Sequence, residues 1–254
     1  MDPSLPPLPP EHPYEPQNTW SYSSHDPNEP EPPIEDPHTA LGTVAAVVET
    51  IKRVLTGPSK FFAGMHEDRS ATAAVILALT IICITRVIGL LVSMILMQLF
   101  PQADFTEVIR EMVDQLQLDI DPEQLTPLFD PTSPGFFLAQ AFMIPVFAVI
   151  GFFISVLIYY LSASIWRAFE PRFSAFIRVY AFAQIPLLIA WIPYLGIAGY
   201  IWSLVLLGYG LVFCGKTTPG RAAGAVISPI LFCCLCMMCL VFFVATMIAG
   251  AAGA

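Results

Sequence analysis

Long apolar runs, separated by gaps that hold the charges, are the feature that most constrains this chain. An α-helix needs about 20 apolar residues to cross the hydrocarbon core of a bilayer. The run from Val179 to Phe213 has 35 residues, and Trp191–Gly196 near its middle combines interfacial aromatics with a proline, which indicates a hairpin between two spans. We therefore predict an all-α, polytopic membrane bundle with five transmembrane helices, at about 71–99, 136–166, 179–192, 196–213 and 222–249.

The basic residues lie in alternate gaps between these runs. Lys and Arg in short loops stay on the cytoplasmic side of a membrane. With five spans and a cytoplasmic N-terminus, nine of the eleven basic residues lie inside, Arg110 lies outside and Arg86 lies within the membrane. The C-terminus is then predicted to lie outside, as is a large acidic loop at 100–135. No segment has the basic surface that nucleic-acid binding requires.

The first 38 residues form an acidic segment that holds twelve of the 24 prolines and no basic residue. A segment with so little apolar area does not offset the entropy of ordering, so we predict a disordered cytoplasmic arm. One interpretation is a solvated spacer. The other is a ligand for a proline-reading module, with Tyr14, Trp20 and Tyr22 as anchors, although such ligands often carry a basic residue that this arm lacks.

Residues 39–68 have the pattern of amphipathic helices. Apolar residues recur at steps of three and four up to two cations, and they are Leu41, Val44, Val48, Ile51 and Leu55. Gly57 and Pro58 then end the helix, and a short segment with Phe61 and Phe62 follows. This region is predicted either to lie in the headgroup layer or to pack beneath the membrane domain.

The outside loop at 100–135 contains a second amphipathic pattern. Phe105, Val108, Ile109, Met112 and Leu116 form one helical stripe, which predicts a short helix capping the bundle. Asp119, Asp121 and Glu123 superficially resemble a calcium-binding loop, but the glycine and the distant glutamate of that motif are missing. We therefore predict no metal site there.

No pattern in the sequence is typical of an enzyme. The apolar runs contain no His, Asp or Glu, and all four histidines lie N-terminal to the first run. The chain has no glycine-rich phosphate loop and no zinc-protease motif. We predict a non-enzymatic protein without a catalytic residue, cofactor or resident metal.

Arg86 is the exception to the apolar rule, because it lies near the middle of the first run. A cation at the bilayer centre costs about 2.5–3.5 kcal/mol by insertion scales, so such a residue is a functional-site hypothesis by default. No carboxylate in the spans is available as a partner. The candidate intramembrane polar site is Arg86 with the amides of Gln140 and Gln184. The alternative is a structural role, in which Arg86 reaches the interface or hydrogen-bonds to backbone carbonyls.

Four cysteines cluster in the fifth predicted span, at Cys233, Cys234, Cys236 and Cys239. Thiolate and thioether ligands select Cu(I), so copper handling is one hypothesis. Packing is favoured, because cysteine behaves as a small hydrophobe and Cys83 is the one facing sulfur that we can suggest. Cys214 is a candidate for palmitoylation.

Two short motifs resemble the Yip1 family of five-span membrane proteins, and its bacterial branch most. The first runs from Val54 to Phe62 and the second from Arg178 to Pro186. The family-like residues are Pro58, Phe61, Phe62, Tyr180 and Pro186. The resemblance covers roughly residues 45–250 and implies a multi-pass protein of the bacterial cytoplasmic membrane. The signature that eukaryotic members carry near the first span is absent, so their Rab GTPase binding is not expected here.

We consider two functions. The first is a non-enzymatic Yip1-type scaffold or adaptor that recruits membrane or cytoplasmic protein partners through its arm and inner loops. The alternative is a carrier or channel for a lipid or small anionic solute, with Arg86 as the binding cation. If Arg86 lines a polar cavity with Gln140, Gln184 or tyrosines, the carrier is favoured. If it contacts only carbonyls and packed side chains, the scaffold is favoured. The sequence does not indicate which oligomeric state the protein adopts.

Overall fold

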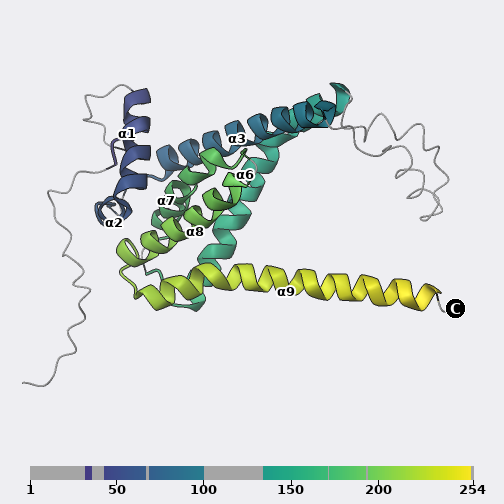
Figure 1. Ribbon diagram of the computed structural model, residues 1–254. Helices are drawn as coiled ribbons and strands as arrows, with labels where there is room; N and C mark the ends of the chain where they lie inside the picture. Colours follow the sequence, from purple (N-terminus) through teal and green to yellow (C-terminus); the bar gives the residue numbers. More distant parts are fainter. Residues whose placement is uncertain are drawn as a thin grey trace, which may run out of the picture.

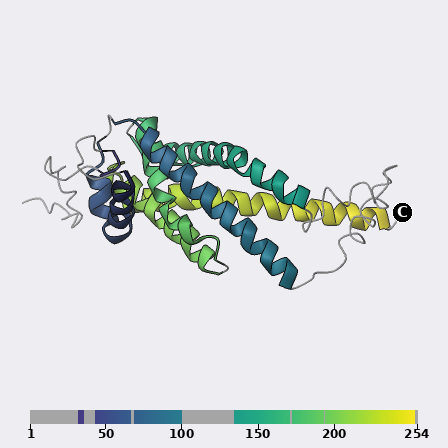
Figure 2. The same cartoon turned by 90° about the horizontal axis from the view of Figure 1, so that it is seen from above.

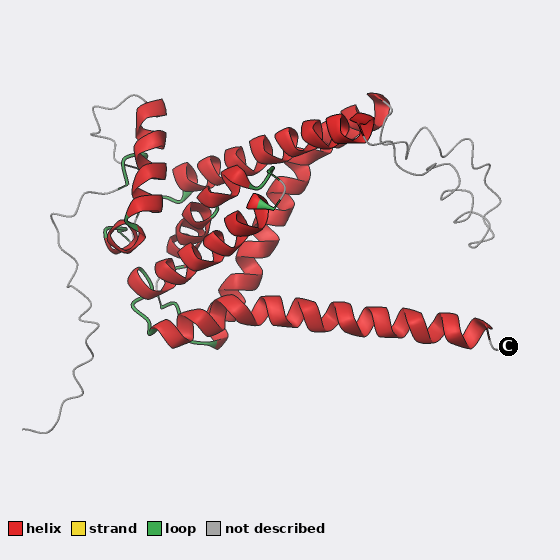
Figure 3. Ribbon diagram, in the orientation of Figure 1, coloured by secondary structure: helices red, strands yellow, loops and turns green. Residues whose placement is uncertain are grey.

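The computed structural model describes residues 32–35, 43–66, 69–99, 134–170, 172–192 and 194–252. Within these ranges the chain is helical and contains no strand (Figures 1 and 3). The predictions for the rest of the arm, for the amphipathic helix at 105–116 and for the calcium-like residues Asp119, Asp121 and Glu123 lie outside the described residues, as does Arg110.

Four helices are long and apolar enough to cross a membrane. They are α3 (Thr72–Leu99), α6 (Pro134–Ile165), α8 (Leu195–Phe213) and α9 (Pro219–Ala252). Their outer surfaces are rich in exposed large apolar side chains, which suit lipid and not water. The prediction of a multi-pass helical membrane protein is confirmed, and these four helices match four of the five predicted spans.

The third predicted span, 179–192, differs from the structure in both length and start. The helix α7 begins at Phe173 and ends at Ala183, and a 3₁₀-helix, η1 (Ile185–Ile189), follows it. Pro186 supplies no backbone N–H and favours the first turn of a new helix, so the α-helix gives way there to a 3₁₀ turn. Arg178, which we placed in a loop, lies inside α7. The segment Phe173–Ile189 is apolar but shorter than the four spans.

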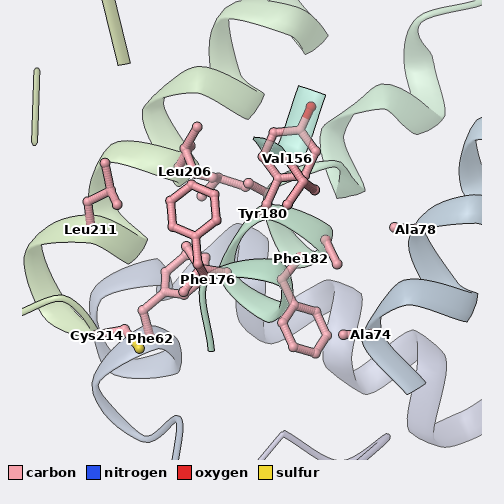
Figure 4. Packing of buried hydrophobic residues seen from close by; sticks show 14 of the residues in the cluster. Phe62, Ala74, Ala78, Val156, Phe176, Tyr180, Phe182, Leu206, Leu211 and Cys214 are labelled. Carbon is pink, nitrogen blue, oxygen red and sulfur yellow. The ribbon is translucent and has the colours of Figure 1, made fainter. Parts of the chain in front are cut away.

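The core lies where α7 packs between its neighbours. Eight of the 11 residues of α7 are buried. The helix α8 packs against both α7 and η1, and its buried residues are small or branched, namely Gly196, Gly199, Ser203, Leu206, Leu207, Gly210 and Leu211. Figure 4 shows aromatic and aliphatic side chains from α2, α7 and α8 meeting in this cluster. A Cβ on Gly210 would lie 2.1 Å from Cγ1 of Val179, so the α7–α8 contact requires glycine there.

Two short helices lie at the end of the bundle where α3 begins. They are α1 (Thr43–Thr56) and α2 (Pro58–Ala63), and Figure 1 shows α1 crossing the direction of α3. Pro58 occupies the first turn of α2, and its neighbour Phe61 packs edge-on against Phe182 with ring centroids 5.0 Å apart. Three described residues of the apolar stripe of α1 stay exposed, Val44 at 78%, Val48 at 59% and Leu55 at 41%, whereas Ile51 packs against the core. That stripe suits the headgroup layer.

Only the first turns of α9 pack against the bundle. Ala222, Ala225 and Val226 are buried, and Ser162 of α6 donates a hydrogen bond of 2.7 Å to the carbonyl of Ala225. Beyond Pro229 the described side chains are exposed, and the helix runs alone to its C-terminal end (Figures 1 and 2).

Candidate intramembrane binding site

Arg86 lies on α3 and lines a cavity of about 820 Å³. The walls of this cavity come from α3, α6, α7, η1 and α8, and Gln140 and Gln184 line it together with Arg86. The structure therefore brings the three predicted polar residues to one place, although they lie far apart in the sequence. Its volume falls within the range of about 300–1,000 Å³ that is typical of ligand sites.

Further polar side chains line the same cavity. They are Thr85, Ser93, Ser155, Tyr180 and Tyr200. Of these we had singled out only Tyr180, and for its resemblance to the family motif alone. Isolated hydroxyls in apolar runs are common, so the sequence gives no signal that would select the other four. Their positions become meaningful only when the helices pack around one space.

Two hydrogen bonds order the cavity wall near Arg86 and Gln184. The hydroxyl of Thr85 donates to the carbonyl of Leu187 at 3.1 Å and is buried. Because Thr85 precedes Arg86, this bond holds the backbone of α3 near the cation against η1. The amide of Gln184 donates to the carbonyl of Tyr180 at 3.3 Å, which orients that side chain at the break between α7 and η1.

The break itself is stabilised by close approach to α8. A Cβ on Gly199 would lie 2.9 Å from the carbonyl oxygen of Pro186, and one on Gly196 would lie 2.7 Å from that of Ala190. Glycine at both positions lets η1 lie against α8 without a clash. Irregular backbone is tolerated in membrane proteins where it is buried in protein or lines a cavity. In η1, Ile185, Pro186 and Leu187 are buried, and Leu187 lines the cavity.

The guanidinium of Arg86 has no hydrogen-bond or ion-pair partner among the residues that the structure describes. The alternative in which Arg86 hydrogen-bonds to backbone carbonyls is not seen among these residues. Arg86 is exposed to this cavity, so its guanidinium is open to a ligand. In the apolar surroundings of a membrane, a cation without a counter-charge attracts an anion more strongly than it would in water. The cavity can therefore hold an anionic group, with amides and hydroxyls as further hydrogen-bond donors.

A second charged group, which the sequence did not reveal, lies on α7. Arg178 forms a bidentate ion pair with Glu35, and the side chains are only 1% and 3% exposed. The Nε–Oε1 distance is 2.9 Å, and Arg178 also donates to the carbonyl of His66. The backbone N–H of Ile34 donates to the hydroxyl of Thr50 at 3.3 Å. The turn Pro32–Glu35, which falls in the predicted arm, is thus bound to the membrane domain.

The sulfur cluster has no such enclosure. Cys233, Cys234, Cys236 and Cys239 are all exposed on the free part of α9. Among the described residues, no group of three or more His, Cys, Asp or Glu side chains is arranged to hold a metal ion. Cys214 is buried at the end of α8, so the palmitoylation hypothesis would require that end of the helix to open.

A comparison with protein families supplies the identity of this fold. The family model described as the Yip1 domain matches residues 52–241. No curated protein and no solved structure matches the chain. The matched range covers about three quarters of the sequence and includes α2, all four membrane-length helices up to the outer part of α9, and every residue that lines the cavity. The chain therefore belongs to the Yip1 family of multi-pass membrane proteins.

Proposed function

We propose that this Yip1-family protein is a carrier or channel that binds an anionic group, on a lipid or a small solute, at Arg86. The observation that carries the proposal is that Arg86, without a partner in the described structure, lines one cavity with Gln140, Gln184, Tyr180 and Tyr200. This arrangement is the one that favours a carrier over a scaffold. The helix break between α7 and η1 supports it, because transporter sites near the bilayer midplane are often built around discontinuous helices.

The proposed topology has five passes, with the N-terminus inside a bacterial cytoplasmic membrane and the C-terminus outside. The 11 residues of α7 and the 5 of η1 rise about 27 Å together, which is close to the hydrocarbon thickness of about 30 Å. Arg69, Arg167, Lys216 and Arg221 follow or precede the start of α3, the end of α6, the end of α8 and the start of α9, and Figure 1 shows these ends toward the side of the bundle where α1 and α2 lie. Reporter fusions at Met1 and after Ala254 test this: a cytoplasmic signal from both ends would contradict five passes.

Movement of anions in proteoliposomes tests the function. We expect the full-length chain to accelerate either the transbilayer movement of an anionic fluorescent lipid or the uptake of inorganic phosphate. Arg86→Leu should abolish that movement. Arg221→Leu is the matched control, because Arg221 is exposed and lies outside the cavity. Equal rates with the wild type and Arg86→Leu, after equal reconstitution, would contradict the proposal.

A second candidate function is that of an adaptor. The Glu35–Arg178 ion pair and the bond from Ile34 to Thr50 fix the end of the arm to the membrane domain, so a partner bound to residues 1–31 would be held at the membrane surface. Crosslinking in the native membrane tests this. Deletion of residues 2–31, which keeps the docked turn, should abolish recovery of the partner, whereas Arg86→Leu should leave it unchanged. Recovery of the same partners without the arm would exclude this role for it.

A further inference from the structure

The wall of the Arg86 cavity has two chemically different parts. One part is polar and consists of Arg86, Gln140, Gln184 and the five hydroxyl side chains described above. The other part consists of large apolar side chains, among them Leu96 of α3 and Met143 and Phe147 of α6. A free anion in water needs the first part and gains nothing from the second.

The apolar part also belongs to the outer surface of the bundle. Phe147 is 66% exposed, Leu96 41% and Met143 39%, and all three line the cavity. Arg86 and Gln140 are exposed as well, so the cavity is open along much of the wall that α3 and α6 form. Figure 2 shows the ends of these two helices apart from each other on the side away from α1 and α2. The cavity is therefore continuous with the surface that faces lipid acyl chains.

This combination specifies the class of ligand. We propose that the ligand is an anionic amphiphile, whose headgroup lies at Arg86 and whose chain leaves between α3 and α6 into the bilayer. The inference rests on the proposed function, and it selects a lipid over a small solute. A chain that passes Phe147 and Leu96 stays in apolar surroundings from the cavity to the bilayer, whereas a small anion has no group that matches this part of the wall. The amide and hydroxyl donors beside Arg86 suit the oxygens of a phosphate or carboxylate headgroup.

Glycine provides a way to block the cavity without disturbing the packing. Gly151 of α6 lines the cavity, and a Cβ built on it would meet no atom within 4 Å. Gly208 of α8 is equally free of close atoms but does not line the cavity. Leucine at Gly151 should therefore occupy ligand space, whereas leucine at Gly208 adds the same bulk elsewhere.

Native mass spectrometry of the detergent-solubilised full-length chain tests the inference. The protein is incubated with equal concentrations of phosphatidylglycerol and phosphatidylcholine that have the same acyl chains. We expect phosphatidylglycerol to be retained at least about tenfold better, because both lipids carry a phosphate but the choline cation of phosphatidylcholine repels Arg86 and offsets the attraction of its phosphate. Tenfold excess glycerol 3-phosphate, which has the anionic group without the chains, should not displace it. Arg86→Gln should remove the preference, and Arg221→Gln should keep it.

The glycine pair keeps the test decisive if Arg86→Gln does not fold. Gly151→Leu should reduce retention of phosphatidylglycerol at least about tenfold, and Gly208→Leu should leave it unchanged. If an equal concentration of glycerol 3-phosphate displaced the lipid, the proposal of an amphiphilic ligand would be wrong, whereas the proposed anion site at Arg86 would keep its support. Equal retention of both lipids, unaffected by Arg86→Gln or Gly151→Leu and without any binding of glycerol 3-phosphate, would overturn the proposed function as well.

Discussion

Replacing Glu35 with glutamine removes the negative charge that compensates Arg178 and nearly preserves the shape of the side chain. Both side chains are almost fully buried, so water cannot take over the lost interaction. Breaking a buried ion pair by removing one partner costs about 3–5 kcal/mol, because it leaves an uncompensated charge. We expect Glu35→Gln to lower the free energy of unfolding by about that amount. Arg178→Met should lower it similarly, because the carboxylate of Glu35 would then be buried without a cation.

The double variant separates this cause from lost packing. If Glu35→Leu and Arg178→Met are combined, no buried charge remains, and buried pairs replaced by apolar residues are often close to neutral. The double variant should therefore be more stable than either of its two single variants, Glu35→Leu and Arg178→Met. Glu49→Gln is the matched control, because Glu49 pairs with Arg53 at 3.0 Å with side chains 32% and 37% exposed. That change should cost less than about 1 kcal/mol.

Reversible unfolding in mixed micelles, followed by tryptophan fluorescence, measures these differences. The reasoning requires a strongly non-additive result for the pair Glu35 and Arg178. A cost for Glu35→Gln no larger than that for Glu49→Gln would refute the buried bridge. Additive costs in the double variant would refute the explanation by uncompensated charge.

Three further changes test the packing around the site. Gly210→Ala should lower the free energy of unfolding by about 1–3 kcal/mol, because the added methyl group overpacks the contact, and Val179→Ala added to it should recover part of that loss. Gly208→Ala should be neutral or stabilising. The free energies of unfolding of the three variants check this. Thr85→Val should cost about 0.5–1.5 kcal/mol and weaken binding of anionic lipid, measured by retention after purification, because it releases α3 from η1. Ser162→Ala should increase protease cleavage near the start of α9, and unchanged cleavage would contradict the role of its hydrogen bond.

The membrane-length helices could be predicted because hydropathy reports them directly. The predicted span 196–213 differs from α8 (Leu195–Phe213) by a single residue, since Trp191 and the following proline mark the hairpin before it. The span at α7 could not be placed in the same way. We treated Arg178 as a loop residue because it is charged, yet its charge is compensated by Glu35, 143 residues away in the sequence. No local pattern predicts a partner at that distance.

The candidate site could be predicted in its polar centre but not in its form. Arg86 stood out because a cation is costly in an apolar run, and Gln140 and Gln184 stood out as amide side chains in other predicted spans. The cavity depends on how the helices pack and on the 3₁₀ turn at Pro186. It also depends on glycines such as Gly199, whose missing side chain lets the carbonyl of Pro186 approach α8 closely. Its apolar wall, including Phe147, looks in sequence like any other lipid-facing surface.

The shift of the thermal unfolding midpoint on addition of anionic lipid measures the central claim most directly. A ligand that binds the folded state raises this midpoint with increasing concentration. We predict that phosphatidylglycerol raises the midpoint of the wild type and of Arg221→Gln by the same amount, and that the shift vanishes in Arg86→Gln. An equal shift in Arg86→Gln would contradict the account, because the anion would then be bound somewhere other than the cavity that Arg86 lines.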